Sequence, residues 1–380
     1  MHELGCGRDG RPGLNQAIYH DRCQRTGDSW KFTERVCQVR YHDTTPLAGS
    51  ARRAAGGDRE SRRPPELHLQ RKEAGAVKAI RIHEPTGISG LVFEEAPDAK
   101  PFFCDVLVKV AACGITHTEL DYPVWTCRAG HQRTLIIPGA EMSGVVAALG
   151  LGTAGIAVGD EVFGLTDQWR DGTAAEYVAV EARNVAPKPA TVDHVHAAAV
   201  PRAGLTAWQA LFDHGKLAKG QTAIIHGAGG AVGSTAVQLA RWAGAEVIGT
   251  GRSHSRSLVT ELGADHFVAL DADRLEDVAG QADLVFDTIG GEVLARSPAL
   301  LRPGGTLVSV AGPPPATRDD IKTAAFIQES NRAQLIELAR LVDEGHLRPQ
   351  VGAVYPLARA AEAFSAKAAG GIPGRIILQP

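Results

Sequence analysis

Residues 222–243 read Thr222-Ala-Ile-Ile-His-Gly-Ala-Gly-Gly-Ala-Val-Gly-Ser-Thr-Ala-Val-Gln-Leu-Ala-Arg-Trp-Ala243 and combine three local patterns. The short apolar run at 223–225 has the length and β-branched content of a buried parallel strand. Four glycines then mark a turn: Gly227, Gly229, Gly230 and Gly233. After the turn, apolar residues recur at steps of three and four, which predicts an amphipathic helix. This stretch therefore predicts a strand, a glycine-rich turn and a helix in succession.

The glycine-rich turn predicts a dinucleotide site. Glycines let the backbone approach a diphosphate, and the helix N-terminus offers free N–H groups and a positive dipole end. The spacing is G-x-x-G-x-x-G rather than G-x-G-x-x-G, so an ordinary tight turn is the alternative. The flanking strand and helix favour the dinucleotide interpretation. We therefore expect the cofactor to contact Gly227, Ala228, Gly229, Gly230, Ala231, Val232 and Gly233.

Bulk properties limit the class of protein. A chain of 380 residues suits about two domains, and a net charge of -3 gives no general attraction to nucleic acid or to anionic lipid. None of the six cysteines forms a C-x-x-C pair, which argues against a zinc ribbon. No apolar run is long enough to span a membrane. We expect a cytoplasmic protein with neither nucleic-acid nor membrane partners.

Residues 1–76 differ in composition from the rest of the chain. They contain paired arginines, paired prolines and paired glycines with little periodicity, which favours disorder. A basic nucleic-acid-binding arm is the alternative, but acidic residues are interspersed. We predict a disordered extension at 1–76, a β domain at 77–200 completed by 345–380, and a cofactor domain at 201–344.

Two patterns of predicted secondary structure follow one another after residue 76. Short strands separated by turns predict an all-β domain up to residue 200, with strands at 77–83, 91–94, 105–111, 144–149, 160–164 and 174–180. Strands then alternate with helices, which predicts a doubly wound parallel sheet. Its expected strands are 246–250, 266–270, 284–287, 306–310 and 325–327, and its expected helices are 205–212, 273–279, 292–301 and 332–343. A tail with strands at 351–355 and 375–378 and a helix at 357–366 is expected to pair with the first domain.

Several motifs occur together in one order: Ile137-Pro-Gly-Ala-Glu-Met-Ser-Gly-Val-Val146, Gly159-Asp-Glu-Val-Phe-Gly164, Leu205-Thr-Ala-Trp208, the glycine-rich turn, Phe286-Asp-Thr-Ile-Gly-Gly291 and Arg302-Pro-Gly-Gly-Thr-Leu-Val308. In this register the chain resembles the medium-chain dehydrogenase/reductase superfamily, and within it the zinc-free quinone oxidoreductase branch that includes zeta-crystallin. The resemblance covers residues 77–380. It implies an α/β fold in which a GroES-like β-barrel domain joins a Rossmann domain, with the active site in the cleft between them.

The same resemblance identifies the positions at which a catalytic zinc ion would be bound. Zinc-dependent members carry Cys and His where this chain has Thr116 and Ala140, and neither a hydroxyl nor a methyl group is a useful zinc ligand. Glu141 is retained, but one carboxylate does not hold the metal. Other Cys and His side chains nearby are interpreted as surface or packing residues: Cys113, His117, Cys127 and His131. We therefore expect no catalytic metal.

The segment after the strand at 246–250 points to NADP(H). It holds Arg252, Ser253 and Arg256 and no carboxylate, so it suits a 2′-phosphate, although both arginines are alternatively solvated loop residues. By resemblance, Thr206 lies by the nicotinamide, with the backbone of Ala311 and Gly312 near it. Thr116, Tyr122 and Trp125 are expected to line the substrate cleft. Tyr122 is a candidate proton donor or a packing residue, and His117 is a weaker candidate.

Together these features predict an NADP(H)-dependent oxidoreductase that transfers hydride to a small electron-poor acceptor, a quinone or an α,β-unsaturated carbonyl. Such an acceptor needs no Lewis acid, because its own π-system spreads the incoming charge. One alternative is a non-catalytic NADPH-binding protein with a structural or regulatory role. Another, within the enzymes, is a pathway-specific enoyl reductase. We expect a homodimer.

Overall fold

The computed structural model describes residues 76–84, 86–116, 119–121, 127–128, 131–132, 135–167, 169–278 and 282–380, and two short segments closer to the N-terminus. It divides into a unit at Met1–Leu69 and a unit at Gln70–Pro380. In the first unit, β1 (Cys23–Thr26) and β2 (Ser29–Phe32) pair antiparallel. The expectation of disorder for the rest of residues 1–75 lies outside the described residues.

A six-stranded parallel sheet forms the cofactor half of the second unit. Its strands lie in the order β14-β13-β12-β15-β16-β17. Their bounds are β12 (Thr222–His226), β13 (Glu246–Gly251), β14 (His266–Ala269), β15 (Ala282–Asp287), β16 (Leu301–Ser309) and β17 (Lys322–Ala325). This is the doubly wound order of a Rossmann sheet, and the order reverses beside β12. The glycine-rich turn follows that strand.

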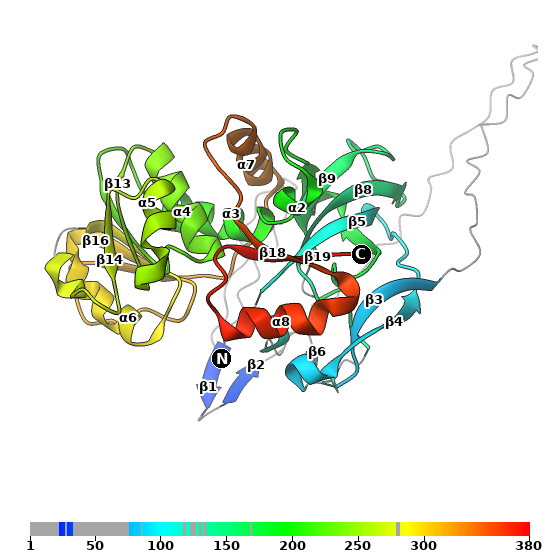
Figure 1. The fold of residues 1–380 in the computed structure, drawn as a ribbon, viewed down its shortest axis with the longest axis horizontal. Helices are drawn as coiled ribbons and strands as arrows, with labels where there is room; N and C mark the ends of the chain where they lie inside the picture. The colour runs from blue at the N-terminus through cyan, green and yellow to red at the C-terminus, as the bar shows by residue number, and fades with distance from the viewer. Residues whose placement is uncertain are drawn as a thin grey trace, which may run out of the picture. The chain divides into compact units, whose positions relative to one another are not determined.

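Helices cover both faces of the parallel sheet (Figure 1). Leu205, Val237 and Leu338 pack on one face, from α3 (Pro201–Trp208), α4 (Ala231–Trp242) and α7 (Arg332–Asp343) respectively. The short α5 (Arg256–Glu261) packs on this same face. On the other face Leu294 of α6 (Gly291–Arg296) packs against Ile224 and Ile248. Burial on both faces explains why the middle of β12, residues 223–225, is a continuous apolar run rather than an alternating one.

A seven-stranded sheet forms the β half of the second unit, as the alternation of short strands and turns predicts. Its main path is β11-β9-β8-β5-β19-β18, and β10 also pairs with β5. Their bounds are β5 (Asp105–Ile115), β8 (Glu141–Leu149), β9 (Glu161–Leu165), β10 (Tyr177–Glu181), β11 (Val185–Pro187), β18 (Val351–Pro356) and β19 (Arg375–Gln379). Strand β19 pairs antiparallel with β5, so the C-terminal tail joins the same sheet.

Smaller elements complete this half. A separate hairpin joins β3 (Ala76–Ile82) to β4 (Leu91–Pro97), and β6 (Cys127–Arg128) pairs with β7 (His131–Gln132). The helices are α2 (His194–Ala197) and α8 (Ala360–Ala369). Within the described residues, no helix is long and apolar enough to cross a membrane.

Several expected boundaries were wrong. The expected helix at 292–301 is α6 followed by a 3₁₀ turn, η7 (Ser297–Leu300), because Pro298 has no N–H with which to continue the helix. The helix expected at 273–279 is a single 3₁₀ turn, η6 (Leu275–Val278). The last parallel strand lies at β17, a few residues before the expected 325–327. Helix α3 begins at Pro201, where proline suits the first turn, and continues as a π-helical segment (Gln209–His214).

His226, at the end of β12, is a buried polar residue of this sheet. Its ring contacts the hydroxyl of Thr250 at 2.8 Å and that of Ser297 at 3.1 Å. Burial lowers the pKa of His226 to about 4, with a small opposing effect from the nearby charge of Asp287. The imidazole is therefore neutral in the folded protein at neutral pH.

This burial predicts acid sensitivity. An unfolded histidine takes up a proton near pH 6.5, whereas folded His226 does so only near pH 4, so stability is lost as pH falls through that window. The loss is on the order of 3 kcal/mol by pH 4. Measured by urea unfolding, the stability of His226→Gln is expected to fall less between pH 7 and pH 4.5 than that of the unmodified protein. The exposed His266 supplies the control His266→Gln, whose pH profile should match the unmodified protein; an unchanged profile for His226→Gln would contradict the assignment.

Candidate active site

The glycine-rich turn has the geometry of a phosphate cradle. Gly227 has a φ of +73°, and its carbonyl accepts a hydrogen bond from the Gly230 N–H at 2.9 Å. A Cβ on Gly233 would lie 2.1 Å from the Gly227 oxygen. The N-cap residue of α4 is Gly230, which has no side chain with which to cap the helix. The first N–H groups of a helix have no partner within the helix, so those of Ala231, Val232 and Gly233 suit an anionic ligand.

The C-terminal segment lies against this turn. Gly374, just before β19, forms a parallel bridge with Gly230. Lys367 of α8 donates to the Gly374 carbonyl at 3.0 Å, and burial lowers the pKa of Lys367 to about 8. The β domain therefore supplies its last strand, with a cationic side chain nearby, to the edge of the cofactor turn.

The three predicted cofactor residues in the loop after β13 have different environments. Arg252 is exposed, and its side chain has no hydrogen bond or ion pair with the described part of the chain. Ser253 donates to Asp271 from its N–H at 2.9 Å and from its hydroxyl at 2.6 Å. Arg256 donates to Asp273 at 2.9 Å and stacks on Phe267. Of the two arginines, Arg252 is thus the one whose side chain is available.

Asp271 is a residue that the sequence reasoning missed. It follows β14, whereas the sequence pattern predicts the cofactor-selecting residues in the loop after β13. Hydrogen bonds from Ser253 hold its pKa below the usual value, so it is charged at neutral pH. The signal was available in principle, because neighbouring parallel strands end at the same edge of the sheet.

The remaining predicted site residues come from several segments of the chain. Ala311 and Gly312 follow β16, and a Cβ on Gly290 would lie 3.1 Å from Ala311. Thr206 is buried in α3 and donates its hydroxyl to the Arg202 carbonyl at 2.7 Å. Tyr122, and with it Trp125 and His117, lies outside the described residues.

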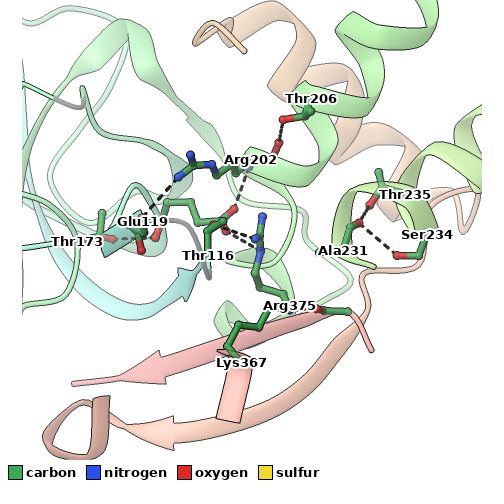
Figure 2. A network of polar contacts seen from close by, with 12 residues as sticks. Thr116, Glu119, Thr173, Arg202, Thr206, Ala231, Ser234, Thr235, Lys367 and Arg375 are labelled. Carbon is green, nitrogen blue, oxygen red and sulfur yellow. Dashed lines mark hydrogen bonds and ion pairs between the residues drawn. The ribbon is translucent and has the colours of Figure 1, made fainter. Parts of the chain in front are cut away.

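A buried ionic network surrounds Thr116, at the end of β5 (Figure 2). Arg375 of β19 donates to the Thr116 hydroxyl at 3.1 Å, and its Nε lies 2.8 Å from Glu141. The other oxygen of Glu141 accepts the Arg202 N–H at 2.9 Å, at the start of α3. The Arg202 guanidinium lies 3.5 Å from Glu119. These contacts join β5, β8, β19 and α3 at one point.

The network is not fully paired. Within the described residues, Nη2 of Arg375 and Oε2 of Glu119 are buried without a hydrogen-bond partner. The Nε of Arg375 and Oε1 of Glu141 form an ion pair without hydrogen-bond geometry. Burial raises the pKa of Glu119 to about 7, although the charge of Arg202 opposes this. Sequence reasoning missed Glu119, Arg202 and Arg375; the one signal was an arginine beginning an otherwise apolar strand.

These residues do not fit zinc. The Thr116 hydroxyl is bound by Arg375, Ala140 contributes a methyl group, and Glu141 faces the same guanidinium. Zinc takes thiolate, imidazole or carboxylate ligands. Among the residues that the structure describes, no three His, Cys, Asp or Glu side chains are grouped closely enough to hold a metal ion.

Comparisons with known proteins agree with the fold. The alcohol dehydrogenase GroES-like domain matches residues 104–190, and the zinc-binding dehydrogenase domain matches residues 262–378. The chain is 30% identical over 320 residues, 78% of this chain and 96% of the relative, to a probable zinc-binding mitochondrial oxidoreductase of Arthroderma benhamiae. It is 30% identical over 287 residues, 72% of each chain, to the chloroplastic NADPH-dependent alkenal/one oxidoreductase of Arabidopsis thaliana.

Solved structures give the same result. The quinone oxidoreductase from Coxiella burnetii superposes with a TM-score of 0.73 at 25% identity, covering 80% of this chain and 100% of that one. The GroES-like sheet, the Rossmann strand order and these relatives lead to one conclusion. The chain belongs to the medium-chain dehydrogenase/reductase superfamily of oxidoreductases.

Proposed function

We propose that this protein is an NADPH-dependent reductase that transfers hydride to a quinone or an α,β-unsaturated carbonyl without a catalytic metal. The observation that carries the proposal is the environment of Thr116. A buried guanidinium, that of Arg375, contacts both Thr116 and Glu141 where zinc-dependent relatives are expected to hold their metal. Relatives named for alkenal/one and quinone chemistry support the same substrate class.

The predicted cofactor residues would each hold a different part of NADPH. The turn from Gly227 to Gly233 would receive the diphosphate, and Arg252 would pair with a 2′-phosphate. Thr206 and the backbone of Ala311 and Gly312 would lie by the nicotinamide. When bound, NADPH supplies the hydride, and the protein supplies orientation and electrostatic stabilisation.

The acceptor would be electron-poor, because the described residues at the two zinc-ligand positions, Thr116 and Ala140, do not suit a metal ion that could polarise a simple carbonyl. Hydride adds to the β-carbon or the quinone ring, and the negative charge spreads to oxygen. Tyr122 remains a candidate proton donor. The domain boundaries, a homodimer and a cytoplasmic location also remain predictions; some relatives are named as mitochondrial or chloroplastic proteins.

The test is NADPH oxidation by the purified full-length chain, followed at 340 nm with a small quinone, a small enone, a simple ketone and a primary alcohol with NADP⁺. We expect turnover with the first two only, unchanged by a chelator. Metal analysis of the same sample serves as the control. Stoichiometric zinc together with chelator-sensitive alcohol oxidation would overturn the proposal, and no turnover with any acceptor would favour the non-catalytic alternative.

A further inference from the structure

We propose that Thr116 donates the hydrogen bond that stabilises negative charge on the acceptor's oxygen, and that Arg375 is the positioning residue that orients and polarises its hydroxyl. The inference rests on the proposed function and deepens it, because it assigns the group that takes the place of a Lewis acid. It follows from the direction of one hydrogen bond and from the distribution of charge around it.

The direction of the hydrogen bond is set by chemistry. A guanidinium has only donors, so in the 3.1 Å contact the Arg375 Nη1 donates and the Thr116 oxygen accepts. The hydroxyl hydrogen of Thr116 must then point away from Arg375. Within the described residues, no group accepts that hydrogen. Thr116 itself is partly exposed, whereas Arg375 and Glu141 are buried, so the network holds Thr116 at its solvent-facing edge.

The surrounding charge favours an anion at this edge. Among the described side chains, Arg202, Arg375 and Lys367 lie in or beside the network with two carboxylates, Glu119 and Glu141, so the described cations outnumber the described anions even if both acids are ionised. Burial strengthens the field of such a group, because few water molecules screen it. A hydroxyl that accepts a bond from a cation also becomes a better donor. Thr116 is therefore suited to bind an oxyanion.

The proposed reaction consumes only the enone, NADPH and water. Hydride passes from NADPH to the β-carbon of the enone, the carbon–carbon double bond shifts toward the carbonyl, and the oxygen becomes an enolate held by the Thr116 O–H. Water then supplies a proton to the α-carbon, giving the saturated ketone, NADP⁺ and hydroxide. Thr116 keeps its own proton throughout, so no further acid or oxidant is required.

The first experiment compares two changes at Thr116 by steady-state NADPH oxidation. Thr116→Val keeps the shape but removes the donor, and should lower kcat for small enones by about 10- to 100-fold. Thr116→Ser keeps the donor and should stay within about threefold. Thr153→Val is the matched control. It also removes one hydrogen bond, the 2.7 Å bond that the Thr153 hydroxyl donates to the Asp105 carbonyl. Thr153 follows the C-terminal end of β8, whereas the network lies at the N-terminal end of that strand. Thr153→Val should leave kcat unchanged.

The second experiment tests Arg375 through Thr116. Removing Arg375 alone would leave Glu141 buried and unpaired, so Arg375→Met is made in a Glu141→Gln background, and the variant that lacks Arg375 then carries no unpaired Glu141 charge. In that background Arg375→Met and Thr116→Val should each lower kcat, and the two together should cost little more than Thr116→Val alone. Additive losses would contradict a role for Arg375 through Thr116.

Two measurements distinguish a role of Thr116 as hydrogen-bond donor to the acceptor from a role in stabilising the fold. The NADPH dissociation constant and melting temperature of Thr116→Val should match the unmodified protein. Across a series of para-substituted aryl enones, its kcat should depend more steeply on electron withdrawal, because the acceptor must then stabilise the charge unaided. Wild-type kcat values in Thr116→Val, or a loss in Thr116→Ser equal to that in Thr116→Val, would overturn the inference. Absence of turnover in the unmodified protein would instead overturn the proposed function.

Discussion

Replacing Gly233 with alanine is expected to weaken NADPH binding by about 100-fold, equivalent to about 2.7 kcal/mol. The added Cβ would lie 2.1 Å from the Gly227 oxygen and 2.8 Å from the Ala228 Cα, distances at which the backbone must move. Gly227 is already in the left-handed region at a φ of +73°, so the turn has little freedom to adjust. The shift would displace the N–H groups that we expect to bind the diphosphate. Fluorescence titration with NADPH measures the dissociation constant.

A matched glycine tests whether this effect is local. A Cβ on Gly251, in β13, would meet nothing closer than 3.6 Å, the ring of Phe267. Gly251→Ala should therefore change NADPH affinity by less than about threefold, since ordinary van der Waals contact carries no overpacking cost. Circular dichroism should show that both variants remain folded. If Gly233→Ala bound NADPH as tightly as Gly251→Ala, the turn would not be the diphosphate site.

Replacing Arg252 with glutamate is expected to reduce the preference for NADPH over NADH by at least about tenfold. A charge-assisted hydrogen bond contributes about 1.5–3 kcal/mol, and the new carboxylate would repel a 2′-phosphate while accepting a bond from a ribose 2′-hydroxyl. Arg252 is exposed and makes no hydrogen bond or ion pair with the described residues, so its loss should not disturb the fold. The ratio of kcat/KM values for the two cofactors is the measurement.

Arg256 provides the comparison, because its guanidinium already binds Asp273 and the Phe267 carbonyl. Arg256→Gln should lower the melting temperature and leave the cofactor ratio near that of the unmodified protein. Asp271→Asn should raise the preference for NADPH, since it removes a negative charge beside Ser253. A cofactor ratio that responds to Arg256→Gln but not to Arg252→Glu would reverse our assignment of the two arginines.

Much of the fold could be predicted from local pattern. The apolar run of β12, the glycines after it and the periodicity of α4 are short-range features, and a parallel strand buried on both faces leaves a distinct pattern in sequence. Errors occurred where one residue overrides periodicity, as Pro298 does at the end of α6. They also occurred where a single 3₁₀ turn replaces a short helix, as at η6, because hydrophobic spacing cannot distinguish the two over so few residues.

The sequence by itself determined the fold class, the glycine-rich turn and the residues at the two zinc-ligand positions, because each depends on residue identity and near-neighbour order. Only the tertiary structure decided which charged groups meet. Arg375 contacts Thr116 from a strand that is adjacent only in the sheet, and Asp271 reaches Ser253 in the same way. Packing between segments far apart in the chain decides that Arg256 rather than Arg252 is already paired. It also decides whether a carboxylate such as Glu119 is buried. Burial and pairing set the energy of a charge, and local sequence contains neither.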